Sequence, residues 1–134
     1  MTVEPVWLDK PLLLALYDDV VVASGGASGL RDEGLLESAL ARPINRRAYE
    51  GVEDLLELAA TYAVGIASNH PFLDGNKRMA FMALGQFLED NGVVLTADTD
   101  DATTVMLSVA TGATDIAALT EWLRNRTLRI GRAP

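Results

Sequence analysis

Two apolar helical patterns that meet at a short polar stretch constrain this chain more than any other feature of its sequence. Apolar residues recur at three- and four-residue spacings over 55–67 and again over 80–88. This spacing predicts two helices, each with one broad apolar face. A connection of about six residues is short, so we expect the two helices to be neighbours in space. The polar residues Asn69 to Arg78 lie at that connection.

The remaining patterns also predict helices. One should run from about Pro11 to Ala23, and after a break of small residues at 24–29 a short one should follow the N-cap Asp32. Pro43 is expected to end that second helix or to begin a further turn. Two more helices should follow Asp100 or Asp101 and the N-cap Thr114, while 93–95 predicts a brief extended segment.

These patterns together predict an all-α fold of six or seven helices in one domain over residues 1–134. The residues from about 125 onward, rich in arginine, are expected to form a flexible basic tail. The net charge of −8 would repel phosphate backbones, which excludes general binding to nucleic acid. No cysteine is present, so thiolate catalysis and cysteine-based zinc sites are excluded. The sequence shows neither a signal peptide nor a long uncharged apolar run, so we expect a cytoplasmic protein with no membrane contact.

The polar stretch has the composition of a site for a phosphate. Gly75 precedes the second of the two helices, and a helix N-terminus carries unpaired N–H groups and partial positive charge. Lys77 and Arg78 fall in its first turn, where cations are electrostatically disfavoured unless an anion binds. Gly75 with Asn76 would form an anion-holding nest, Lys77 would act as a point charge, and Arg78 would offer paired N–H groups. The alternative is an exposed cationic pair on a solvated face.

Three further residues of the stretch have a structural interpretation, and two of them, His70 and Asp74, also have a catalytic one. His70, the only histidine, either caps the preceding helix or acts as a general base. Phe72 is most simply a buried anchor for the loop. Asp74 either caps the following helix or binds Mg²⁺, a hard cation that takes one or two carboxylates together with nucleotide phosphates.

A second polar segment, residues 45–51, is expected to be a loop or short hairpin. It contains Asn45, Arg46, Arg47, Tyr49 and Glu50. Its simplest interpretation is a solvated connection between helices.

His70 to Arg78 resembles the signature of the Fic/Doc superfamily: His-Pro-Phe, two positions, Gly-Asn, one position, and Arg. The form of the motif with lysine before the arginine resembles the death-on-curing (Doc) branch, whose members are the toxins of bacterial toxin–antitoxin pairs. The segments 25–32, 35–40 and 87–92 also resemble that branch, so the likeness covers nearly the whole chain.

The resemblance implies a compact helical fold with ATP as co-substrate and Mg²⁺ as cofactor. It implies that His70 removes the proton from a protein hydroxyl, that Asp74 holds Mg²⁺, and that residues 75–78 cradle the phosphates. It places the family's target-docking flap at residues 45–51, with elongation factor Tu as the target known in the Doc branch. The sequence lacks the superfamily's self-inhibitory string of Ser or Thr, three positions, Glu, then Gly or Asn. Inhibition is therefore expected from a separate antitoxin whose segment folds into an apolar groove.

Lys77 bears on the reaction, because most members of the superfamily have glycine there and transfer AMP. The lysine form resembles Doc, which transfers the γ-phosphoryl group instead. We expect phosphoryl transfer, with AMP transfer as the alternative. A third hypothesis is a catalytically inactive binding module of the same fold.

Overall fold

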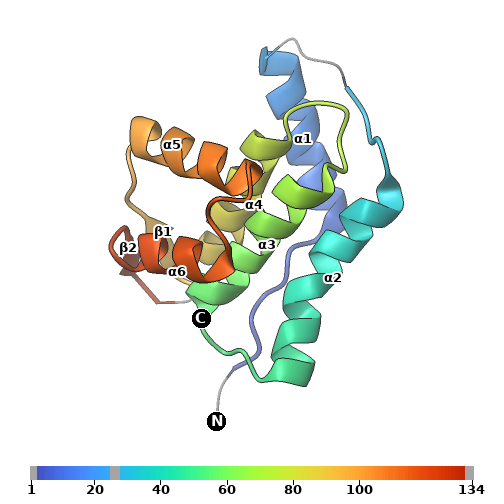
Figure 1. The fold of residues 1–134 in the computed structure, drawn as a ribbon. Helices are drawn as coiled ribbons and strands as arrows, with labels where there is room; N and C mark the ends of the chain where they lie inside the picture. Colours follow the sequence, from blue (N-terminus) through green and yellow to red (C-terminus); the bar gives the residue numbers. More distant parts are fainter. Residues whose placement is uncertain (1–2, 25–27, 132–134) are drawn as a thin grey trace.

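The computed structural model describes residues 3–24 and 28–131, and this part of the chain is mostly helical (Figure 1). Among these residues there are six helices and one two-stranded antiparallel sheet, and no helix is both long and apolar enough to cross a membrane. Residues 25–27 of the expected break lie outside the described residues. The elements in chain order are α1 Lys10–Ser24, α2 Glu33–Glu50, α3 Leu55–Asn69, α4 Asn76–Asp90, β1 Val93–Leu95, α5 Thr99–Ala110, α6 Ile116–Arg124 and β2 Thr127–Arg129.

Helix α3 is the centre of the fold, as its apolar pattern predicts. It packs against α2, α4, α5 and α6, and nearly all of its residues from Leu56 to Ala67 are buried. The α2 side is very close: a Cβ added to Gly65 would lie 3.3 Å from the Cβ of Ala39. Asp54 caps the helix by accepting from the Leu56 N–H at 2.9 Å. The C-terminal end of α3 therefore has a fixed position, and the polar stretch begins there.

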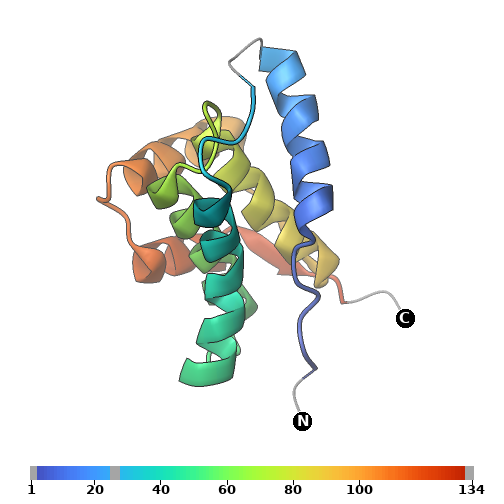
Figure 2. The same cartoon turned by 90° about the vertical axis from the view of Figure 1, so that its right-hand side faces the viewer.

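Helix α1 lies beside α4 and α2 on the opposite side of the molecule from α5 and α6 (Figure 2). Its residues Leu13 and Tyr17 join the core, and Trp7 of the preceding segment stacks on Phe87 of α4 at 5.9 Å between ring centroids. Asn91, just after α4, holds the same N-terminal segment through both backbone groups of Val6.

The structure corrects the expectation for residues 45–51. Helix α2 continues through Pro43 to Glu50 without a loop or hairpin, and Gly51 ends it in the left-handed conformation. Pro43 is buried inside the helix, and Arg46 ties the last turns to α3 by donating to Thr61 Oγ1 at 2.8 Å and to Glu57 Oε2 at 2.7 Å. These tertiary bonds stabilise helix beyond the proline, although proline alone disfavours it.

The expected tail is also wrong for the residues up to Gly131. Thr127–Arg129 form β2, which pairs with β1 in antiparallel register, Val94 opposite Leu128. Arg126 holds the approach to this strand, because its guanidinium pairs with Asp101 and lies 4.6 Å from the centre of the Trp122 ring. The N-cap of α6 is Asp115 rather than Thr114.

Candidate functional site

The polar stretch forms the connection from the C-terminus of α3 to the N-terminus of α4 (Figure 1). His70 is the C-cap of α3, and its amide donates to the Ile66 carbonyl at 3.2 Å. Its φ of 49° makes it the one non-glycine residue with positive φ among those described. A left-handed conformation costs an ordinary residue roughly 1–2 kcal/mol, so the surrounding contacts must hold it. The imidazole is exposed.

Phe72 anchors the middle of the connection in the core. Its side chain is 1% exposed and stacks on Tyr17 of α1 with 4.1 Å between ring centroids. The Tyr17 hydroxyl accepts from the Gly29 amide at 3.1 Å, and the Leu73 amide donates to the Gly29 carbonyl at 3.0 Å. The burial agrees with the anchor role predicted for Phe72, and the loop is held from α1 and from the segment before α2.

Asn76, predicted to form a nest with Gly75, uses its side chain within the loop. Its side chain is buried, accepts from the Phe72 amide at 3.0 Å and donates to the Phe72 carbonyl at 2.9 Å. These two bonds fix which side of the amide carries nitrogen, and that nitrogen lies 3.5 Å from His70 Nδ1. The side chain therefore shapes the loop and faces the imidazole, which leaves only the backbone N–H of Asn76 for a phosphate.

The N-terminus of α4 offers amides and cations to an anion. Gly75 is its N-cap with φ of 79°, and no side chain caps the helix. Lys77 and Arg78 are exposed, and neither forms an ion pair with any residue in 3–24 or 28–131. Two like charges at the positive end of a helix repel each other and the helix dipole, so this arrangement favours a bound anion.

A cleft adjoins this helix end, between the start of α4 and helix α5. Its volume is about 510 Å³, within the usual range for small-ligand sites. Asp74, Gly75, Lys77 and Arg78 line it at the start of α4, and Asp74 Oδ1 accepts from the Gly75 amide at 2.8 Å. Further polar lining comes from the start of α5, at Asp98, Thr99 and Thr103. The apolar lining comes mainly from Phe81 of α4 and from Ala102, Met106 and Leu107 of α5.

The α5 wall of the cleft was not predicted as part of a site. Met106 and its neighbours recur at helical spacing, which in sequence is indistinguishable from a core-facing pattern. His70 does not line the cleft, and its Nδ1 lies 3.5 Å from the side-chain nitrogen of Asn76, the first residue of α4. The structure thus brings Asp74, Gly75, Lys77 and Arg78 together at one cleft, while His70 lies outside its lining and contacts Asn76 at the start of α4.

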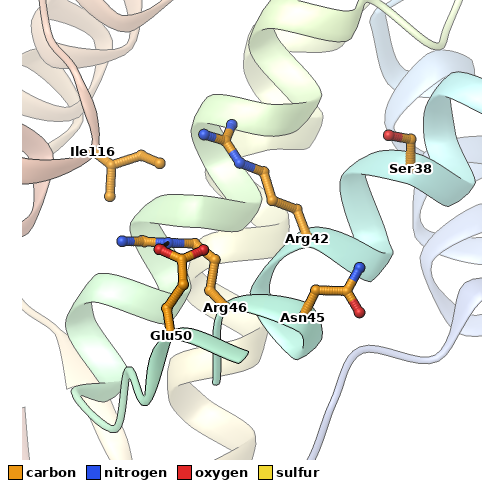
Figure 3. A pocket seen from close by; sticks show the side chains of 6 residues that line it. All are labelled: Ser38, Arg42, Asn45, Arg46, Glu50 and Ile116. Carbon is orange, nitrogen blue, oxygen red and sulfur yellow. Dashed lines mark ion pairs between the residues drawn. The ribbon is translucent and has the colours of Figure 1, made fainter. Parts of the chain in front are cut away.

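The residues predicted for the flap lie elsewhere, on the last turns of α2. Asn45, Arg46 and Glu50 line a second pocket of about 400 Å³ together with Ser38, Arg42 and Ile116 of α6, and Arg46 pairs with Glu50 at 3.7 Å (Figure 3). Arg47 pairs with Glu53, and Tyr49 is 84% exposed. Because 45–50 is helical, its backbone N–H groups are used within α2, and the segment is not extended as a strand-like flap would be.

Comparison with known proteins agrees with this arrangement. The sequence profile described as the Fic/DOC family matches residues 7–88, which run from the segment before α1 through the polar stretch to the end of α4. The chain belongs to the Fic/DOC family. The resemblance seen in the motif is therefore confirmed, and the mostly helical fold agrees with the expected fold class.

Two relatives within this family carry the name Doc. The protein kinase Doc of Escherichia phage P1 is 37% identical over 112 residues, which cover 84% of this chain and 88% of the relative. The toxin Doc of Mycolicibacterium smegmatis is 41% identical over 103 residues, which cover 73% of this chain and 78% of the relative. This Fic/DOC chain is thus similar to Doc proteins over most of its length.

Proposed function

We propose that this Fic/DOC protein is a Doc-type toxin that transfers the γ-phosphoryl group of ATP to a hydroxyl of a protein. The observation that supports this most is the junction of α3 and α4. There the buried side chain of Asn76 lies between an exposed imidazole and a helix N-terminus that carries Lys77 and Arg78, two cations without an ion pair among the described residues. A general base close to a phosphate-binding helix N-terminus suits a reaction between a hydroxyl and the phosphate of a nucleotide.

His70 is assigned as the general base. The orientation of the Asn76 amide presents an N–H to Nδ1 at 3.5 Å, so in the neutral ring Nδ1 carries the lone pair and Nε2 the hydrogen. The 3.5 Å contact is long for a hydrogen bond, and a substrate hydroxyl would replace it readily. The base nitrogen then faces the start of α4.

In the proposed transfer, residues of this chain accept the proton and stabilise the phosphate charge. The hydroxyl oxygen forms a bond to the γ-phosphorus while its proton passes to His70, and the bond from the γ-phosphorus to the bridging oxygen breaks, so ADP leaves with that electron pair. The amides after Gly75, with Lys77 and Arg78, would stabilise charge on the phosphate oxygens. A positioned base of this kind contributes typically 10²–10⁴ in rate.

Asp74 is the residue that would hold Mg²⁺. It lines the cleft, and the Gly75 amide engages one of its carboxylate oxygens, Oδ1. Within residues 3–24 and 28–131 there is no cluster of three or more histidine or acidic side chains that could enclose a metal. One carboxylate completed by phosphates and water is a common Mg²⁺ environment, so the residues fit this ion. When bound, the ion supplies positive charge that neutralises phosphate oxygens.

The specificity for the γ-phosphoryl group is proposed from Lys77. Its side chain adds volume and charge at the helix N-terminus, and the phage P1 relative that is named a kinase is 37% identical. The test is incubation of the protein and a bacterial lysate with ATP labelled at either the α- or the γ-phosphate. Label retained on protein from the γ position is the expected result. Label retained from the α position would replace the kinase assignment with AMP transfer.

His70→Ala separates an enzyme from an inactive binding module of the same fold. The variant should lose label transfer and should no longer arrest growth when expressed alone. Arg124→Ala is the matched control, because Arg124 is an exposed residue that pairs with Asp54 and Glu121 away from the α3–α4 connection. If His70→Ala still arrests growth as the parent does, the protein acts by binding and the catalytic proposal is wrong.

Two partners complete the proposal. The target is elongation factor Tu, whose phosphorylation would block translation, and the reaction would take place in the cytoplasm. An antitoxin segment that orders on an apolar groove of this protein would inhibit it. Coexpression with an antitoxin that binds this protein should restore growth. Purified elongation factor Tu should take up γ-label; if it stays unlabelled while other lysate proteins are labelled, the target assignment is wrong and the transfer stands.

A further inference from the structure

We propose that Arg31 is a positioning residue for His70, acting on its backbone from the segment before α2. The Arg31 Nε donates to the His70 carbonyl at 2.7 Å, and its Nη2 donates to the Asn69 carbonyl at 2.8 Å. The guanidinium thus spans the last two carbonyls of the α3 C-terminus. This inference rests on the proposed role of His70 as general base.

Those two carbonyls need a partner. The last carbonyls of a helix have no intrahelical donor and carry partial negative charge, so a cation that donates to them is favoured. His70 adds a second demand, because it holds a left-handed conformation without being glycine. A planar guanidinium with its donors in a fixed fork satisfies two neighbouring carbonyls at once and so fixes the plane of the peptide bonds on both sides of His70. A lysine ammonium, a single point of charge, lacks this geometry.

Arg31 is itself held in register with the loop. Its amide donates to the Pro71 carbonyl at 2.7 Å, and Leu30 forms an antiparallel bridge with Phe72. These main-chain bonds survive substitution of the Arg31 side chain. The backbone pairing of the two segments can therefore stay in place while the two side-chain bonds are removed, which isolates the effect of the guanidinium.

The position of Arg31 also defines which kinetic constant it should affect. Arg31 does not line the cleft beside α4, and it contacts the carbonyls of residues 69–70 rather than the amides after Gly75. Loss of its side chain should misplace the imidazole but leave the nucleotide site intact. We expect kcat to fall roughly 10- to 100-fold, the cost of a small misplacement of a reacting group, with KM for ATP unchanged.

The test compares the parent, Arg31→Ala and Arg31→Lys by γ-label transfer and by NMR. His70 is the only histidine, so labelling with ¹⁵N-histidine gives one backbone amide signal that reports on this residue alone. Arg124→Ala is the control for loss of an exposed arginine with two ion-pair partners. In both Arg31 variants the His70 amide signal should shift, and its hydrogen exchange should rise about tenfold or more. The control should leave the signal, the exchange rate and kcat unchanged.

Several results would overturn the proposal. An unchanged His70 signal in Arg31→Ala would show that the guanidinium does not set this backbone, and a rise in KM for ATP alone would place Arg31 in nucleotide binding. Full recovery of the signal and of kcat in Arg31→Lys would show that charge suffices and the fork is irrelevant. If the parent transfers no label at all, the proposed function fails, but the amide signal still decides whether Arg31 holds His70.

Discussion

Replacement of Asn76 by alanine tests the geometry of the site most sharply among single substitutions. The side chain is 8% exposed and satisfies both backbone groups of Phe72, with bonds of 3.0 and 2.9 Å. Alanine would leave a buried donor and a buried acceptor unpaired, at about 1–3 kcal/mol each. Since part of this cost is relieved by relaxation of the loop, we expect a loss of about 2–4 kcal/mol in the free energy of unfolding. A domain of this size, stable by about 5–15 kcal/mol, should stay folded.

Asn91 provides a matched control in the same chain. Its side chain holds Val6 as Asn76 holds Phe72, accepting from the amide at 2.8 Å and donating to the carbonyl at 2.9 Å. It is 5% exposed and also donates to the Phe87 carbonyl. Asn91→Ala should therefore lose at least as much stability as Asn76→Ala, but far from His70.

Urea unfolding followed by circular dichroism measures the two losses, and γ-label transfer is then compared at a temperature where both variants are folded. Asn76→Ala should reduce transfer roughly 100-fold, because the contact that faces the imidazole and the anchor of the loop are both lost. Asn91→Ala should transfer at the parent rate. Equal transfer by the two variants would refute the reasoning that Asn76 aligns His70 with the start of α4.

Three further predictions concern other parts of the fold. Burial raises the pKa of Tyr62 to about 12 from 10.0, so between these pH values the unfolded chain releases a proton that the folded chain keeps. The free energy of unfolding should therefore fall by up to about 2–3 kcal/mol as pH rises from about 10 to 12. Urea titrations at alkaline pH should show this slope in the parent and not in Tyr62→Phe. Gly75→Ala and Gly51→Ala should each lower the free energy of unfolding by about 1 kcal/mol, because both glycines have positive φ and open space for a Cβ. Only Gly75→Ala should slow label transfer, because Gly75 lines the cleft and Gly51 does not. A hydrogen bond from Arg126 lowers the pKa of Asp101 below its ordinary value of 3.8. The free energy that this pair adds to folding should be present near neutral pH and lost as pH falls through the lowered pKa. Acid unfolding of Asp101→Asn should not show this loss.

The central helices and the helix start at Gly75 could be predicted from the sequence because their signals are local. The apolar spacing within 55–67 and 80–88 needs no information from other segments, and both predicted helices form at these positions. Gly75 at the start of α4 follows the same logic, since its positive φ is a conformation that glycine adopts without strain. Asp32 caps the helix for which it was predicted.

The errors occur where distant residues decide the local structure. Pro43 is a strong helix breaker in sequence, but Arg46 is tied to α3 by bonds to residues 11 and 15 positions away. Thr127–Arg129 forms a strand only because β1 lies alongside it. The sequence also gives no sign that the Asn76 side chain bonds both backbone groups of Phe72. No local pattern encodes such partners.

Binding of an unreactive ATP analogue with Mg²⁺, followed by NMR, tests the central claim most directly: one nucleotide contacts both the base and the helix N-terminus. The single histidine gives unambiguous ring signals for His70, and backbone labelling resolves the amides of Gly75 to Arg78. We predict that the His70 ring signals and these amides shift together with the same dependence on analogue concentration. Shifts confined to the α2 pocket around Arg42, with the His70 ring and the α4 amides unmoved, would contradict the account.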